Sequence, residues 1–87
     1  MLIKKKIWPE YFAAVASGKK KFELRLNDFT VAAGDTLLLQ EWDPKTQSYT
    51  GRELEKQVTY AAAFRLDELF WPQAEIEAKG LLLISLE

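Results

Sequence analysis

The sequence predicts an α+β fold, a small β-barrel that is mixed but mostly antiparallel, with one main helix after the first strand. Three observations lead to this prediction. The chain has 87 residues, enough for one hydrophobic core, so a single domain over residues 1–87 is expected. Hydrophobic residues make up 48% of it, which is typical of a globular domain. These residues alternate in several short runs and follow helical spacing in one run, which predicts strands around one helix.

The first elements are a strand, a helix and a second strand. Residues 2–7 alternate in a way that suits a strand better than a helix. Pro9 suits the first turn of a helix, and apolar residues recur every three or four positions until a glycine, so a helix is predicted over residues 9–17. Residues 20–27 then place charged and polar side chains on one side and apolar ones on the other, which predicts a strand.

The rest of the chain predicts three more strands and an interrupted helix. Residues 36–42 contain three consecutive leucines, typical of a buried strand. Turn-forming residues at 43–51 predict a hairpin loop, so residues 52–62 are expected to return antiparallel. Residues 64–79 predict a short helix interrupted by a proline, and residues 81–86 a last strand. Closing these strands into a barrel would bury their apolar faces and leave few free edges.

The composition excludes several kinds of chemistry. The chain contains no Cys and no His, which excludes disulfides, thiol catalysis and nucleophiles activated by histidine. We therefore expect no metal site and no cofactor, and any acid–base chemistry must come from Lys, Glu, Asp or Tyr. The sequence shows no signal-peptide pattern and no apolar run of membrane-spanning length. A cytoplasmic protein without membrane contact is expected.

The charges are unevenly distributed along the chain. The formal net charge is −1 at pH 7, which argues against a strongly electrostatic nucleic-acid binder. However, lysines at residues 4–6 and 19–21 make the first third basic, whereas acidic residues dominate the remainder. This distribution predicts one basic patch on an acidic body, and the alternative is a mixed, solvated surface.

The densest chemical signal lies at residues 18–25, where a glycine is followed by three lysines, a glutamate and an arginine. Lys20 and Glu23 are three residues apart, so a straight strand would point them to opposite faces. They can meet only if Lys20 lies in the bend after Gly18. The alternatives are a half-buried strand with a solvated charged face, and an ion pair that only pins the junction of helix and strand.

Gly18, Lys20, Glu23 and Arg25 form the pattern Gly-x-Lys-x-x-Glu-x-Arg, and further motifs accompany it across residues 3–60. These are Trp8-Pro9-Glu10-Tyr11-Phe12, Asn27-Asp28, Gly34-Asp35, Glu41-Trp42-Asp43-Pro44 and Tyr49-Thr50-Gly51-Arg52. Together they resemble the ASCH domains of the PUA-like superfamily, and more narrowly a bacterial and phage subgroup of uncharacterised ASCH-like domains. The chain departs from that subgroup at Ile3, where a His is usual, and at Phe29-Thr30, where Arg-Asp is usual.

The resemblance implies a PUA-like barrel whose cleft, between helix and sheet, handles RNA or modified nucleosides. Some small bacterial ASCH proteins are amidohydrolases that remove the acyl group from N(4)-acetylcytidine with a Lys, a Thr and a Glu. Lys20 matches that Lys, but Glu23 stands where the Thr is expected. The usual nucleophile is therefore absent, which argues against a covalent acyl-enzyme intermediate.

The predicted function is hydrolysis of the acyl amide of N(4)-acylated cytosine nucleosides, with Lys20, Glu23 and Arg25 as the candidate catalytic residues. Glu23 would activate water as a general base, and a nucleophilic role stays open. Lys20 would polarise the acyl oxygen or protonate the departing amine, and Arg25 would anchor the base or hold Glu23 ionised. The resemblance also implies a downstream glutamate, for which the candidates are Glu68, Glu75 and Glu77.

Four further residues are candidates for binding the substrate, a modified pyrimidine nucleoside. Trp8 and Tyr11 could stack on the pyrimidine ring, and the alternative is packing of the helix on the barrel. Asn27 and Glu41 could hydrogen-bond the edges of the base, and the alternative is simple solvation. A monomer is expected because a closed barrel buries its own apolar faces.

The alternative function is a non-catalytic RNA-binding module of the PUA-like type. Its lysines, at residues 4–6 and 19–21, would contact phosphates while Trp8, Tyr11 or Trp71 stacked on bases. Such binding would be sensitive to salt, whereas turnover of a neutral nucleoside would not. A ribonuclease, with Lys20 and either Tyr49 or Glu23 as its catalytic groups, ranks last because the chain is net acidic and has no His.

Overall fold

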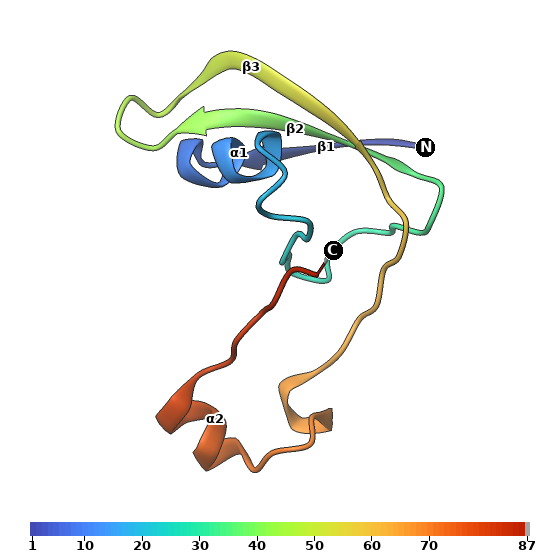
Figure 1. The fold of residues 1–87 in the computed structure, drawn as a ribbon, viewed down its shortest axis with the longest axis vertical. Helices are drawn as coiled ribbons and strands as arrows, with labels where there is room; N and C mark the ends of the chain where they lie inside the picture. Colours follow the sequence, from blue (N-terminus) through green and yellow to red (C-terminus); the bar gives the residue numbers. More distant parts are fainter. Residues whose placement is uncertain (87) are drawn as a thin grey trace.

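The computed structural model describes residues 1–86. Its elements follow one another along the chain as one strand, one helix, a β-hairpin and two short helical segments (Figure 1). They are β1 (Leu2–Ile7), α1 (Pro9–Ala16), β2 (Thr36–Asp43), β3 (Ser48–Gln57), the 3₁₀ turn η1 (Leu66–Glu68) and α2 (Gln73–Lys79). The predicted α+β class is confirmed.

The three strands form one mixed sheet in the order β1-β2-β3. β1 runs parallel to β2, with Leu2 opposite Thr36 and Ile7 opposite Glu41. Parallel neighbours need a crossover connection, and α1 lies within it. β2 and β3 are antiparallel, and their register shifts between Gln40 and Trp42. This irregularity lies at Glu41, whose buried carboxylate it positions.

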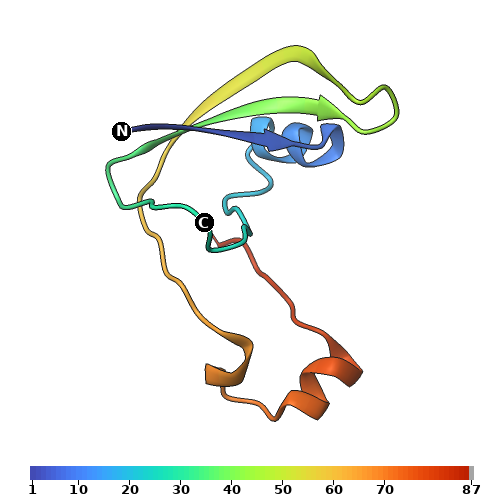
Figure 2. The same cartoon turned by 180° about the vertical axis from the view of Figure 1, so that it is seen from behind.

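One face of the sheet is covered by α1, as Figures 1 and 2 show from opposite sides. The buried apolar side chains come from β1, β2 and α1, and partly buried leucines of β2 and β3 pack against them. The buried residues are Ile7, Phe12, Val15 and Leu39, and the partly buried ones are Leu37 and Leu54. The core is therefore small and lies between α1 and the sheet.

The chain turns back directly after α1. Pro9 occupies the first turn of the helix, where its missing N–H is not needed. Gly18 has a φ of 82°, a left-handed conformation that glycine adopts without strain, and its N–H donates to the carbonyl of Val15. The N–H of Lys20 then donates to the carbonyl of Ala14 at 3.0 Å. The bend predicted after Gly18 is confirmed, and it holds the backbone of Lys20 against the C-terminal end of α1.

The predicted strand at residues 20–27 is wrong. This segment has no strand pairing in the structure. Its polar groups are used in another way, because Glu23 and Arg25 bond through their side chains and the Arg25 guanidinium reaches the carbonyl of Lys6 in β1. The segment is therefore fixed by side-chain bonds instead of a backbone ladder.

The predicted last strand at residues 81–86 is also wrong, and the sheet of the described residues has three strands and is not closed into a barrel. The hairpin was predicted in the right place with the wrong bounds. β3 begins at Ser48 instead of residue 52 and ends at Gln57 instead of residue 62. The ladder starts early because Asp43 pairs with Ser48 and Trp42 with Tyr49, whose ring packs edge-on against the indole at 5.0 Å between centroids.

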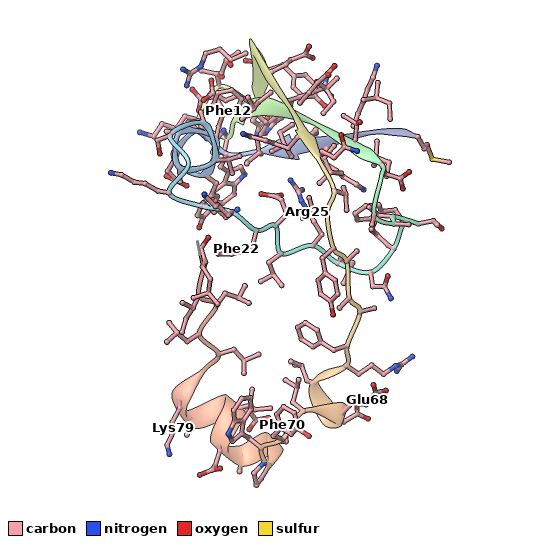
Figure 3. The ribbon with its side chains drawn as sticks, turned by 45° about the vertical axis from the view of Figure 1, so that its right-hand side comes forward. Phe12, Phe22, Arg25, Glu68, Phe70 and Lys79 are labelled. Atoms are coloured by element: carbon pink, nitrogen blue, oxygen red, sulfur yellow. The ribbon has the colours of Figure 1, made fainter. Side chains whose placement is uncertain are left out.

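Residues 59–86 leave the sheet as an extended excursion, which we call the arm (Figures 1 and 2). It contains η1 and α2, and the interruption predicted at Pro72 is confirmed because α2 begins directly after it. Figure 3 places Phe70 and Lys79 at the end of the arm that is farthest from Phe12. No helix within residues 1–86 has the length and apolar character needed to cross a membrane.

Candidate functional site

Lys20 and Glu23 meet, as the bend after Gly18 requires. The Lys20 Nζ atom donates to Glu23 Oε1 at 2.8 Å. Both side chains are largely covered, with 17% of Lys20 and 16% of Glu23 exposed. A charged pair held this far from water is more strongly coupled than an open surface pair.

Arg25 completes a three-residue ionic network around the Glu23 carboxylate. Its Nε atom donates to Glu23 Oε2 at 2.9 Å, and its Nη2 atom donates to the carbonyl oxygen of Lys6. Each carboxylate oxygen thus accepts one bond from a different cation and retains acceptor capacity for a second donor. Because Lys6 belongs to β1, Arg25 ties the network to the edge of the sheet.

Aromatic rings surround the Lys20 ammonium group. The centroids of Phe22 and Tyr11 lie 5.1 Å and 5.3 Å from Lys20 Nζ, within the range of cation–π attraction. Tyr11 also lies beside Trp8, with the ring centroids 6.4 Å apart and the planes inclined by 18°. Trp8 and Tyr11 are each 50% exposed. An aromatic surface, open to solvent, therefore borders the ionic network.

Phe12 differs from its aromatic neighbours because it is buried in the core between α1 and the sheet. The sequence motif Trp8-Pro9-Glu10-Tyr11-Phe12 thus divides between two roles. Trp8 and Tyr11 reach the solvent beside Lys20, and Phe12 packs inward, as expected from helical spacing.

Glu41, predicted to bind a base edge, lies in a separate ionic cluster. It is 3% exposed, and its Oε1 atom accepts from Arg52 Nε at 2.9 Å and from Thr50 Oγ1 at 2.6 Å. Its Oε2 atom accepts from Arg52 Nη2 at 2.7 Å. The hydrogen bonds from Arg52 and then Thr50 lower the pKa of Glu41 to about 2. The structure thus directs both carboxylate oxygens to groups of its own sheet.

The shift of register between β2 and β3 explains this cluster. Gln40 pairs with Glu53 and Trp42 with Tyr49, so Glu41 alone faces the three residues 50–52. Gly51 has a φ of 93°, which lets β3 bulge there without strain. The sequence motif Tyr49-Thr50-Gly51-Arg52 contains the glycine of the bulge and both partners of Glu41. The sequence alone predicted no role for Thr50 or Arg52. Arg52 also stacks over Phe12, with its guanidinium carbon 4.8 Å from the ring centroid.

The remaining candidates lie away from the Lys20–Glu23 pair. Asn27 is exposed, two residues beyond Arg25. Glu75 pairs with Lys79 within α2 at 3.6 Å, and Glu77 accepts a hydrogen bond from Gln73 in the same helix. Figure 3 shows Glu68 toward the far end of the arm, well apart from Phe22 and Arg25. The structure therefore brings none of the three downstream glutamates to Glu23.

A hollow of about 390 Å³ opens beside the network, on the side of the flanking lysines. It is lined by Ser17, Gly18, Lys19, Lys21, Ser85 and Leu86. Lys20 and Glu23 are not among its lining residues, so this hollow is not the predicted cleft at the Lys20–Glu23 pair. Residues 1–86 contain no cluster of three or more carboxylate side chains that could hold a metal ion.

The fold and this site define a small α+β domain in which an ionic network and an aromatic surface flank one helix. The model of the family described as a domain of unknown function, DUF3850, matches residues 3–70, and the chain belongs to that family. The matched residues include both ionic clusters and end before α2.

The chain is also similar to a protein of Escherichia phage P2 described as an uncharacterized 12.9 kDa protein in the GpA 3′ region. The two are 41% identical over 54 residues, which cover 62% of this chain and 48% of the phage protein. The match thus spans about half the length of that relative. No solved structure matches the chain.

Proposed function

We propose that this domain is a small amidohydrolase that removes the acyl group from N(4)-acylated cytosine nucleosides such as N(4)-acetylcytidine. The observation that supports the proposal is the network of Lys20, Glu23 and Arg25 beside the exposed rings of Trp8 and Tyr11. It joins a carboxylate that can act as a general base, two cations that can stabilise negative charge, and a flat apolar surface that can stack on a pyrimidine. The substrate class comes from the resemblance to ASCH domains.

The first chemical step is attack of water on the acyl carbon. The Glu23 carboxylate retains acceptor capacity beyond its bonds to Lys20 and Arg25, so it can hold a water molecule and take its proton during attack. The new carbon–oxygen bond converts the acyl oxygen into an oxyanion. In the proposed mechanism the ammonium group of Lys20 stabilises that developing charge, and Arg25 holds Glu23 in position.

The second step breaks the bond between the acyl carbon and the N4 atom of cytosine. The protonated Glu23 returns its proton to the departing nitrogen, so the products are the free cytosine amine and the carboxylic acid. The carboxylate is thereby regenerated without a covalent intermediate. This route needs no threonine nucleophile, which suits a chain with Glu23 at that position.

Trp8 and Tyr11 supply the surface for the pyrimidine. Stacking of a base on an aromatic side chain contributes roughly 1–3 kcal/mol, and both rings are half exposed and available to a ligand. A neutral nucleoside needs no phosphate contact, so the rate is expected to vary little with salt.

A PUA-like arrangement of sheet and helix belongs to the same proposal, as the resemblance to ASCH domains implies. The hydrogen bond from the N–H of Lys21 to Ser85 Oγ, at 2.9 Å, supports it because it brings residues 20–27 back to residues 81–86 beside the helix.

The test is incubation of the full chain with N(4)-acetylcytidine and chromatographic measurement of cytidine. The wild type is expected to release cytidine at equal rates at low and high salt. Glu23→Gln should lose at least about 100-fold in rate, the lower end of a general base's contribution. Glu10→Gln, a change of an exposed carboxylate on α1, is the matched control and should retain the rate. No release by the wild type would refute the proposal.

RNA binding is the second candidate function, and one observation favours it. Lys19 and Lys21 line the hollow and flank Lys20, whose Nζ atom lies 5.3 Å from the centroid of Tyr11, so phosphate and base contacts could come from neighbouring residues. This function predicts affinity for single-stranded RNA that falls steeply with salt and is unaffected by Glu23→Gln. Those two results, together with the absence of deacylation, would select it over the amidohydrolase.

A further inference from the structure

The arm, residues 59–86, exposes an unusual amount of apolar surface. None of its residues is buried. Ten of the large hydrophobic side chains that the structure leaves exposed belong to it: Tyr60, Phe64, Leu66, Phe70, Trp71, Leu81, Leu82, Leu83, Ile84 and Leu86. Phe70 is 93% and Leu82 is 83% exposed. Apolar patches of this size on a folded chain mark surfaces that are covered by something else.

The accessible surface of the chain is larger than that of a compact chain by enough to form a protein–protein interface. The accessible area of the chain is 7165 Å², whereas a compact chain of this length keeps roughly 5,200 Å². The radius of gyration is 14.8 Å against about 12 Å for a compact domain of this length. The excess of roughly 1,900 Å² exceeds the roughly 800 Å² that each partner buries in an interface of standard size.

The end of the arm is tied to the first third of the same chain, because the N–H of Lys21 donates to Ser85 Oγ, but the part around Phe70 and Lys79 has mainly internal interactions. Phe70 packs edge-on against Trp71, and Lys79 pairs with Glu75. The extensive contacts between elements join β1 to β2, β2 to β3 and α1 to β2. Figure 3 shows the arm side chains around Phe70 and Lys79 separated from the unit of sheet and helix. The chain's own core therefore does not cover the part of the arm around Phe70 and Lys79.

The charges identify a suitable partner. The arm carries four acidic and two basic residues, whereas residues 1–30 carry seven basic and three acidic ones. An acidic arm on one copy thus complements the basic first third of another copy. Because each copy has both surfaces, two copies can satisfy both contacts at once in a closed pair with twofold symmetry.

We propose that two copies of this chain associate with the arm of each packed against the basic first third of the other. Apolar side chains of the arm supply the buried area, and the complementary charges set which surfaces meet. The earlier expectation of a monomer depended on a closed barrel that would bury its own apolar faces. The described residues leave the sheet open, so that reason does not apply.

The first test is sedimentation velocity of the full chain over a range of concentrations. The wild type should form a dimer, and Phe70→Glu with Leu82→Glu should weaken it at least about 100-fold, since two large apolar side chains lose their burial. In the single chain these side chains are exposed, so at concentrations where both proteins are monomeric the double variant should keep the unfolding temperature of the wild type. Gln73→Glu with Ala78→Glu adds the same charge without removing large apolar groups and is the matched control.

The second test asks which surface the arm meets. Asp67→Lys with Glu68→Lys should weaken the dimer about 10-fold or more, because the arm would then face lysines. Lys4→Glu with Lys19→Glu in that same chain should restore it, since both signs are reversed together. These four residues are exposed and lie outside the Lys20–Glu23 network.

Four results would overturn the proposal. These are a wild-type monomer at every concentration, growth beyond a dimer, equal dissociation of the Glu variant and its control, and no recovery in the chain with both reversals. A monomer would mean that the arm is covered by a different chain or by further sequence of a longer protein.

Discussion

Replacing Trp8 with alanine tests the aromatic surface of the proposed site with little risk to the fold. The side chain is 50% exposed, so its removal sacrifices little core packing. The helix keeps its first hydrogen bond, since that bond runs from the Phe12 N–H to the backbone carbonyl of Trp8. The backbone at Trp8 is extended, with φ −72° and ψ 154°, which alanine also adopts.

The expected effect follows from the stacking contribution of one ring. A loss of roughly 1–3 kcal/mol corresponds to an increase of about 5- to 150-fold in KM for N(4)-acetylcytidine. The value of kcat should stay within about twofold, because stacking holds substrate and transition state equally. Tyr60→Ala, which removes an exposed ring of the arm, is the matched control and should leave KM unchanged.

The assay is the initial rate of cytidine formation over a range of substrate concentrations, combined with thermal unfolding of each variant. An unchanged KM for Trp8→Ala would remove Trp8 from the binding surface. A fall in kcat at constant KM would assign Trp8 a part in the chemical step and refute the reasoning that it binds the base uniformly. A large loss of thermal stability would show that Trp8 packs structurally.

Three further predictions concern the ionic groups and the core. Lys20→Ala should lower kcat at least about 100-fold while the free energy of unfolding changes by roughly 1–3 kcal/mol, so a variant that loses stability alone would make the pair purely structural. Glu41 has its pKa lowered to about 2 from an ordinary 4.5, so the unfolded state binds more protons between those values and stability falls as pH drops from about 4.5 to 2. Glu41→Gln should flatten that part of the curve of stability against pH, measured by denaturant unfolding, and an unchanged slope would contradict the assignment. Leu39→Ala should cost about 2–5 kcal/mol in the same measurement, because Leu39 is 1% exposed at the centre of a small core, and a cost below 1 kcal/mol would show that the core lies elsewhere.

The parts of the fold that depend on local pattern could be predicted from the sequence. The alternation in residues 2–7, the proline at the start of α1 and the leucines of β2 each determine their own element. The segments at residues 20–27 and 81–86 carry equally good strand patterns, but a strand also needs a neighbour with free backbone groups. In the structure the first segment is held by side-chain bonds and the second continues the arm, so pattern alone was insufficient.

The candidate site divides in the same way. The Lys20–Glu23 contact could be predicted because Gly18 and a three-residue spacing restrict the local geometry. The bond from Arg25 to the Lys6 carbonyl joins residues 19 apart, and the cluster of Glu41, Thr50 and Arg52 depends on a bulge in the register of two strands. Neither follows from spacing along the chain. The sequence therefore indicated which residues carry charge and the structure determined which of them are partners.

The most direct test of the central claim, that Lys20 and Glu23 direct water onto an acyl amide, is a turnover experiment in water enriched with oxygen-18. The full chain is mixed with N(4)-acetylcytidine, and cytidine and acetate are quantified by mass spectrometry. We predict one atom of oxygen-18 in each acetate, equal amounts of cytidine and acetate, and no labelled oxygen in the protein. Absence of cytidine, or label appearing in the Glu23 carboxylate, would contradict the account.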